Sequence, residues 1–159
     1  MVTLPLSTGG AIDIYNALGS VDAIVDVDGY FSSAVSGYFE PVVPARICDT
    51  RASNSTQCAG KTIGPAGTLD VQVAGNGGVQ GDAAAVIANV TATGPTADSF
   101  LTVYPEGSAQ PNASDLNFVL GQTVANLCVA KLSSSGGLTI FNALGSVNAI
   151  VDVAGWFTG

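Results

Sequence analysis

The sequence predicts an all-β protein, and its composition, hydrophobic periodicity and turn clusters lead to that class. Of its 159 residues, 47% are hydrophobic and 10% are charged, and Gly, Ala, Val, Ser, Thr and Asn dominate. This composition favours strands and tight turns and is poor for helices. Several segments alternate between apolar and polar residues, whereas no window of useful length shows helical periodicity. Many short strands at regular spacing predict a two-sheet β-sandwich of jelly-roll type with antiparallel strands.

The expected strands follow one another along the whole chain. We predict strands at residues 11–16, 21–31, 38–43, 45–51, 68–74, 84–93, 99–104, 114–119, 123–132, 137–142 and 147–157. The clusters GNGG (75–78), GPTAD (94–98), PEGSAQPNAS (105–114) and SSSGG (133–137) separate several of them. Gly, Pro, Asn and Ser at these places interrupt regular structure and form turns.

A sequence repeat near both ends organises the chain. Leu6–Phe31 aligns without gaps on Leu132–Phe157, with 17 of 26 positions identical, and both copies contain the phrase NALGSV(D/N)AIVDV. Each copy predicts a β-hairpin, in which NALGS is the turn between two strands. We therefore predict a complete β domain at residues 33–159, preceded at residues 1–32 by a connector hairpin or by the C-terminal hairpin of a preceding repeat. The offset of 126 residues also divides into three units of about 42, so a β-trefoil is the alternative architecture.

A spare hairpin needs a partner. Isolated hairpins are marginally stable in water, and unpaired apolar strand edges invite pairing with another chain. We expect the first copy to pack on its own domain or on a neighbouring molecule, so the predicted partners are neighbouring repeats or copies of this chain.

The charge balance excludes some classes of partner. Four Lys and Arg stand against twelve Asp and Glu, which gives a net charge of −8. Binding to nucleic acid or to anionic membranes depends on basic patches, so we expect neither nucleic acid nor a membrane surface as a partner. No apolar run is long enough to span a bilayer, so no membrane insertion is predicted. Few lysines and many Thr, Ser and Asn residues are typical of extracellular or cell-surface proteins.

The three cysteines predict one disulfide. Cys48 and Cys58 enclose a polar loop, and a bond between them would close a small ring and stabilise the fold. Cys128 lies in an apolar strand and is predicted to be a buried core residue. No cysteine pair has CxxC spacing and the sequence has no His, so we predict no metal site of the usual zinc type.

Two of the four basic residues lie close together around a carboxylate. Arg46, Asp49 and Arg51 are predicted to form a structural ion-pair network, because a guanidinium satisfies carbonyl and carboxylate groups together. The alternative is a site for an anion or a sugar carboxylate. Asp26 and Asp28 resemble a fragment of a calcium loop, but two carboxylates supply too few of the six to eight oxygens that calcium takes. We expect Asp26 to hydrogen-bond a turn instead.

Catalysis is not predicted. No His is present to act as a base for Ser or Thr, and no GxSxG elbow occurs. The carboxylates have no distinctive spacing of the kind that glycoside hydrolysis needs. We therefore expect a protein that is not an enzyme and that carries no cofactor.

Aromatic pairs end both copies of the repeat. Tyr30 with Phe31 and Trp156 with Phe157 are adjacent on predicted strands, so the two rings of a pair point to opposite faces. We expect one ring of each pair in a core and the other at an interface, and we name these four residues as interface anchors. The alternative is a carbohydrate-stacking platform that also includes Tyr38, Phe39 and Tyr104.

The order of several motifs resembles a known family. These motifs are VPARICDTR (43–51), NVTATGP (89–95), LTVYPEG (101–107), SDLNF (114–118), GQTVAN (121–126) and DVAGWF (152–157), and DVDGYF (26–31) closes the first copy. Together they resemble a secreted tandem-repeat domain common in actinobacteria and some other bacteria. The resemblance covers essentially the whole chain and implies a non-catalytic structural or adhesive module, found in tandem or beside secreted hydrolases. We expect a module that builds a stalk, filament or surface layer, and the alternative is a carbohydrate-binding module for cell-wall or surface glycans.

Overall fold

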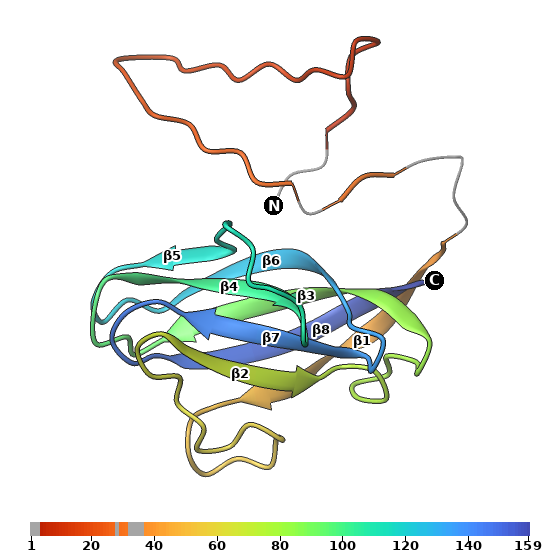
Figure 1. Ribbon diagram of the computed structural model, residues 1–159, viewed down its shortest axis with the longest axis vertical. Helices are drawn as coiled ribbons and strands as arrows, with labels where there is room; N and C mark the ends of the chain where they lie inside the picture. The colour runs from red at the N-terminus through yellow and green to blue at the C-terminus, as the bar shows by residue number, and fades with distance from the viewer. Residues whose placement is uncertain (1–3, 28, 32–36) are drawn as a thin grey trace.

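The fold is a two-sheet β-sandwich (Figure 1). The computed structural model describes residues 4–27, 29–31 and 37–159, and no helix occurs among them. The eight strands are β1 (Phe39–Asp49), β2 (Gly67–Gln72), β3 (Ala83–Thr93), β4 (Ser99–Pro105), β5 (Leu116–Phe118), β6 (Val124–Lys131), β7 (Gly137–Asn142) and β8 (Asn148–Thr158). The all-β class and the two-sheet sandwich predicted from the sequence are thereby confirmed.

The strands pair in a nested order. One sheet has the order β1-β8-β3-β6 and the other β2-β7-β4-β5, and all pairs are antiparallel. Strands from opposite ends of the domain are therefore neighbours, as β1 with β8 and β2 with β7. Between residues 39 and 158, the turn from β4 to β5 is the one connection that stays within a sheet. The last two strands take inner positions, because β7 lies between β2 and β4 and β8 between β1 and β3 (Figure 1).

The body strands lie close to their predicted positions, with one difference. The strands expected at residues 38–43 and 45–51 form the single strand β1. The pairing of β1 with β8 shifts register between Pro41 and Ala45. Pro44, which has no amide hydrogen to donate, lies in this irregular stretch, so it interrupts the ladder without ending the strand.

Apolar side chains from both sheets meet in a single core. Burial alternates along β3, as expected for a strand with one face towards the opposite sheet. The largest fully buried apolar side chains are Leu101, Leu138, Ile140, Val71, Val73, Val86, Val90, Val147, Val151 and Val153. Five of them belong to β7, β8 and the turn between these strands, so the last part of the chain supplies much of the core. Cys128 is buried in the core, as predicted.

The hairpin predicted for the second copy of the repeat is wrong. Within Leu132–Phe157, β7 pairs with β2 and β4 while β8 pairs with β1 and β3, so the two strands lie in different sheets. The turn between them crosses the sandwich instead of folding β8 back along β7. Two strands and a turn have the same local pattern in either arrangement, so periodicity does not distinguish them. We call Leu132–Phe157 the C-terminal arch and Leu6–Phe31 the N-terminal copy.

The N-terminal copy is not built into the sandwich. Its described residues, 6–27 and 29–31, form no strand and are exposed, so the strands expected at 11–16 and 21–31 are absent there. The positions that equivalent strands take in the body are already filled by β7 and β8. In Figure 1 this segment runs as an extended trace beside the sheets. Asp28 and the predicted boundary between residues 32 and 33 lie outside the described residues.

Candidate interaction site

The predicted ion-pair residues lie together where β1 meets β8. Arg46 is the cross-strand neighbour of Asp152, and its Nε and Nη2 donate hydrogen bonds of 2.8 and 3.0 Å to the two carboxylate oxygens. Arg46 Nη1 lies 3.6 Å from Asp49 Oδ2. Asp152, which the sequence did not place in this network, is thus its fourth member.

Asp49 is the buried centre of the network. Arg51 Nε and Nη2 donate hydrogen bonds of 3.0 and 2.7 Å to its two carboxylate oxygens, and the Arg51 amide donates a third. The hydrogen bonds from the Arg51 side chain are the main reason that the pKa of Asp49 lies below its usual value of 3.8, although burial acts in the opposite direction. The hydrogen bonds to Asp152 raise the pKa of Arg46, and those to Asp49 raise the pKa of Arg51.

The network is electrically balanced. Two guanidinium groups face two carboxylates, so the four formal charges sum to zero. Each arginine already forms two hydrogen bonds to a carboxylate, so an incoming anion would meet guanidinium groups whose charge is already balanced. The geometry therefore serves to join β1 to β8 and to fix the chain after β1, and it offers no surplus positive charge to a ligand.

The loop after β1 is closed by the predicted disulfide. Cys48 and Cys58 are linked, with 5.1 Å between their Cα atoms. Within the loop, Gln57 donates a hydrogen bond to the Gln72 carbonyl of β2 and accepts one from the Gln72 amide. The loop thereby connects the end of one sheet to the edge strand of the other.

Thr50 in this loop also contacts the C-terminal arch. Its amide donates to the Ala149 carbonyl and its hydroxyl accepts from the Ala149 amide. The hydroxyl also donates a hydrogen bond of 3.0 Å to Asn148 Oδ1. The loop therefore holds the beginning of β8 in place.

The four predicted anchors fall into different environments. Trp156 is 7% exposed and packs in the core of its own domain, so its prediction as an interface anchor is wrong. The pairing of β8 with β3 shifts register between Val153 and Gly155, and beyond this shift Trp156 points inwards while Phe157 is half-buried on the outer side. The Phe157 ring lies 5.4 Å from that of Phe39 and 6.3 Å from that of Phe31. Phe31 and Tyr30 are exposed.

The aromatic residues proposed as a carbohydrate platform are likewise dispersed. Tyr104 is buried in β4, whereas Tyr38 and Phe39 are exposed near the start of β1. Trp156 is enclosed by the core, so the seven rings do not form one flat surface. The grouping that the structure does show is the aromatic contact of Phe31, Phe39 and Phe157 at the end of β8.

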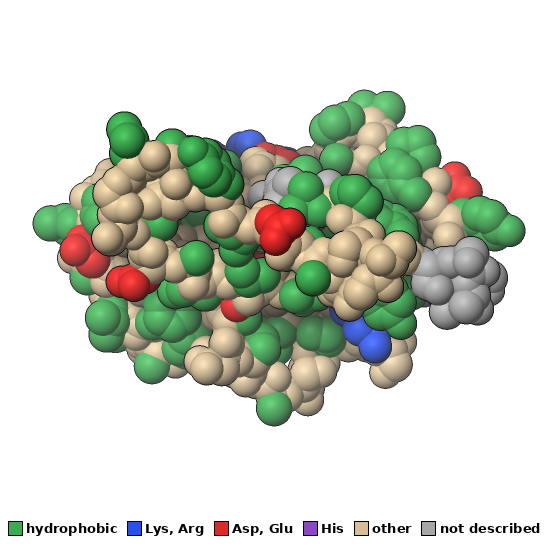
Figure 2. Space-filling model, turned by 90° about the horizontal axis from the view of Figure 1, so that it is seen from above, with side chains coloured by type: hydrophobic (Ala, Val, Ile, Leu, Met, Phe, Trp, Pro, Cys, Tyr) green, Lys and Arg blue, Asp and Glu red, His purple; other side chains and the backbone are tan. Residues whose placement is uncertain are grey.

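The N-terminal copy and the two residues before it expose many large apolar side chains. These are Leu4, Leu6, Ile12, Ile14, Tyr15, Leu18, Val21, Ile24, Val25, Val27, Tyr30 and Phe31. Figure 2 views the molecule from the side on which this segment lies in Figure 1, and hydrophobic side chains cover much of that face. Contiguous exposed apolar surface of this kind marks an interaction site in soluble proteins.

Sequence reasoning missed one buried polar residue of the arch. Asn142 is completely buried, and its amide nitrogen donates hydrogen bonds of 3.0 Å to the Gly64 carbonyl and 2.9 Å to the Gly145 carbonyl. The same asparagine occurs in the N-terminal copy as Asn16, which donates a 3.0 Å bond to Gly19, the counterpart of Gly145. The identity of the two copies at this position was the available signal.

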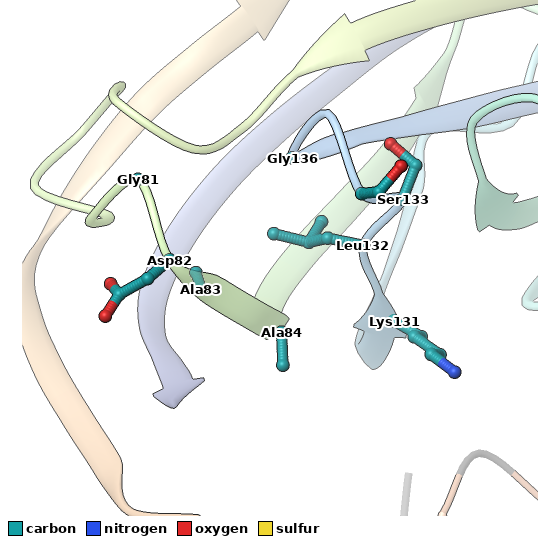
Figure 3. Close-up of a pocket in the computed structure, with 9 residues that line it drawn as sticks. Gly81, Asp82, Ala83, Ala84, Lys131, Leu132, Ser133 and Gly136 are labelled. Carbon is teal, nitrogen blue, oxygen red and sulfur yellow. The ribbon is translucent and has the colours of Figure 1, made fainter. Parts of the chain in front are cut away.

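Two shallow hollows occur on the described surface. The first is lined by Gly81, Asp82, Ala83, Ala84, Lys131, Leu132, Ser133, Ser134 and Gly136. Figure 3 shows the side chains of Asp82 and Lys131 pointing away from each other, so they do not converge on a common point. The second hollow places the half-buried ring of Phe100 beside the polar side chains of Gln110, Asn112 and Asn117.

Neither a metal-binding cluster nor a membrane-spanning helix occurs in the described part of the chain. Within residues 4–27, 29–31 and 37–159, no three His, Cys, Asp or Glu side chains are grouped so that they could hold a metal ion. The same part of the chain has no helix with the length and hydropathy that crossing a membrane requires. The chain matches no protein-family model and no curated protein.

Proposed function

We propose that this chain is a non-catalytic, extracellular structural module that assembles with neighbouring repeats or with copies of itself. Assembly uses strand pairing and apolar packing by the N-terminal copy. The observation that carries the proposal is the exposure of the N-terminal copy, whose sequence elsewhere in the same chain forms two inner strands of a core. Exposed strand-forming sequence with apolar side chains favours pairing with another sheet.

Other features support an extracellular module. The Cys48–Cys58 disulfide is typical of proteins that fold in an oxidising compartment. The motif order that resembles secreted bacterial tandem repeats is consistent with two copies of one segment in a single chain. The charged residues that the fold gathers neutralise one another and hold strands together, which favours a structural role for them.

Light scattering combined with size exclusion tests the proposal. The full chain is compared with a version that lacks residues 1–32 and keeps all eight strands. We expect the full chain to associate with rising concentration and the shortened chain to remain a folded monomer. A matched variant, Ile24→Ser with Val27→Ser, keeps the chain length and should weaken association, because both side chains are exposed and apolar. If both the full and the shortened chain are monomeric at every concentration, assembly through this segment is overturned.

The hollow at Phe100 favours a second candidate function, the binding of carbohydrate. An aromatic ring beside three amide side chains offers a stacking surface with hydrogen-bonding groups at its edge. Titration with soluble cell-wall glycan fragments tests this function, with Phe100→Ala as the variant and the exposed Tyr15→Ala as its control. Saturable binding that only Phe100→Ala abolishes would support it, whereas no binding by the full chain would exclude it for these glycans.

A further inference from the structure

We propose that the N-terminal copy is a donor arch, and that its partner is another sandwich of this type whose own β7 and β8 positions are vacant. The preferred partner has an uncharged residue where this chain has Asp70. The inference rests on the proposed function, because it names, beyond the apolar association of like copies, the partner that this segment fits best. Three structural requirements of the positions of β7 and β8 are met by residues of the N-terminal copy.

The first requirement of the arch position is glycine at three places where a side chain has no room. A Cβ at Gly136, Gly145 or Gly155 would collide with Ala74, with Thr96 and Ala97, or with the Phe39 ring. The N-terminal copy has glycine at all three equivalent positions, namely Gly10, Gly19 and Gly29. At a fourth place, Gly137, a Cβ would meet the end of the Glu106 side chain, and the N-terminal copy has Ala11 there, so this flexible side chain would have to move. An exposed segment has no such neighbours to avoid, so the glycines fit the demands of an arch position.

The second demand is for a buried amide at the crossing turn. Asn142 satisfies the Gly64 carbonyl, and its Oδ1 accepts a 3.0 Å hydrogen bond from Ser99. Without it, buried polar groups of the partner strands would lose their hydrogen bonds, which is costly. The N-terminal copy provides Asn16 here, and the bond from Asn16 to Gly19 shows that the local turn forms before any partner is present.

The third demand is for acceptors that face the strand β1 and its loop. Asp152 accepts from Arg46, and Asn148 Oδ1 accepts from the hydroxyls of Thr50 and Thr62. The equivalent residues of the N-terminal copy are Asp26 and Asp22, whose carboxylates also accept hydrogen bonds. The apolar positions of β8 are kept as well, with Val25 at the place of Val151 and Tyr30 at that of Trp156.

A charged residue of the N-terminal copy does not fit this chain's own body. The hydroxyl of Thr139 in β7 donates a 2.6 Å hydrogen bond to Asp70 Oδ1 of β2, its cross-strand partner. The N-terminal copy has Asp13 at this position, which would place two carboxylates opposite each other. Like charges at directly opposed positions destabilise a strand pair. The body therefore prefers its own C-terminal arch, and the donor fits best where the acid at position 70 is replaced.

The body of this chain nevertheless offers a way to test the donor. Phe39 at the start of β1 is paired with Phe157, and seven residues, 32–38, separate Phe39 from Phe31, the counterpart of Phe157. A loop of that length is enough to connect antiparallel neighbours. The Phe31 ring already lies 6.3 Å from that of Phe157, so the segment ends beside the position it would take. If the C-terminal arch is disabled, the donor should enter the vacant position of its own body.

The experiment disables the C-terminal arch in the full chain by Val151→Asp, which places a charge in the core. The chain has one tryptophan, Trp156, and it lies in that arch. We expect the variant to retain β-sheet circular dichroism and a cooperative urea transition, while the fluorescence of Trp156 shifts to that of an exposed indole. The cysteine pair Asp26→Cys and Asn89→Cys should then form a disulfide, because Asn89 is the cross-strand partner of Asp152.

Matched variants decide whether the donor is responsible. Val25→Asp alone should leave the folded-to-unfolded ratio of the wild-type chain unchanged, because Val25 is exposed. When it is combined with Val151→Asp, it should lower that ratio more than about a hundredfold, because the donor would then bring a charge into the core. In the Val151→Asp chain, Asp70→Asn or Asp13→Thr should raise that ratio about two- to fivefold. The proposal is overturned if the Val151→Asp chain and the chain with both Val25→Asp and Val151→Asp are equally stable. It is also overturned if the Val151→Asp chain is unfolded and Asp13→Thr does not restore its folding. These readouts come from one chain in isolation, so they stand apart from the light-scattering test.

Discussion

The N-terminal copy and the C-terminal arch differ at nine of 26 positions, yet one is exposed and the other forms two inner strands. Asn16 and Asn142 form the same local turn bond in both. The difference is the set of partners, because β7 and β8 each have two neighbouring strands and the N-terminal copy has none in the described structure. The preference of a segment for extended structure is therefore set by its own sequence, whereas the formation of a strand depends on neighbouring strands with which it can pair.

The largest expected contrast between the two copies is at their aromatic positions. Trp156→Ala should lower the free energy of unfolding by about 3–5 kcal/mol, because it removes a large side chain from the core. Tyr30→Ala should change it by less than about 0.5 kcal/mol, because Tyr30 is 82% exposed. Urea unfolding followed by circular dichroism measures both. Similar losses in the two variants would mean that the N-terminal copy is packed in solution.

The asparagine pair gives a polar version of the same contrast. Asn142→Ala should cost about 2–4 kcal/mol, because it leaves the Gly64 carbonyl without its bond and opens space in the core. Asn16→Ala removes one exposed turn bond and should cost about 0.5 kcal/mol or less. The same urea measurement applies. Equal losses of unfolding free energy in the two variants would contradict the view that neighbouring strands distinguish the C-terminal arch from the N-terminal copy.

The disulfide tests how far the loop after β1 supports the C-terminal arch. Replacing both Cys48 and Cys58 by Ala should lower the free energy of unfolding by about 2–3 kcal/mol, because the loop that holds the start of β8 is no longer closed. Adding reductant to the wild type should produce a similar loss and should not affect the double variant. Full stability after complete reduction of this bond would show that the loop does not support the arch.

The smallest expected effect depends on pH. The folded-state pKa of Asp49 is depressed by Arg51, so its ionic contribution is present above the unfolded value of 3.8 and is lost as pH falls through the folded pKa. Asp49→Asn should therefore cost about 1–3 kcal/mol near neutral pH, and the difference from wild type should shrink below about pH 4. Urea unfolding between pH 7 and about pH 2 measures it. A difference that stays constant over this range contradicts the assignment of the network.

Some elements of the site could be predicted because their pattern is short-range. Cys48 and Cys58 enclose one polar loop, and Arg51 lies two residues from Asp49, so each pair meets through local geometry. The bond between Arg46 and Asp152 joins residues 106 apart in sequence and depends on the pairing of β1 with β8. No local pattern encodes such a pair, which is why Asp152 was missed. Trp156 was misplaced because the register shift between Val153 and Gly155 changes which side chains of β8 point inwards.

The sequence by itself determined where the body strands lie, which cysteines pair and which two segments are equivalent. Alternation, turn residues and identity between copies are properties of neighbouring residues, so they are readable along the chain. Only the tertiary structure decided that β7 and β8 belong to different sheets and that the N-terminal copy remains outside them. A strand's backbone groups can pair with many edges, and the choice among them is made by side chains that are distant in sequence.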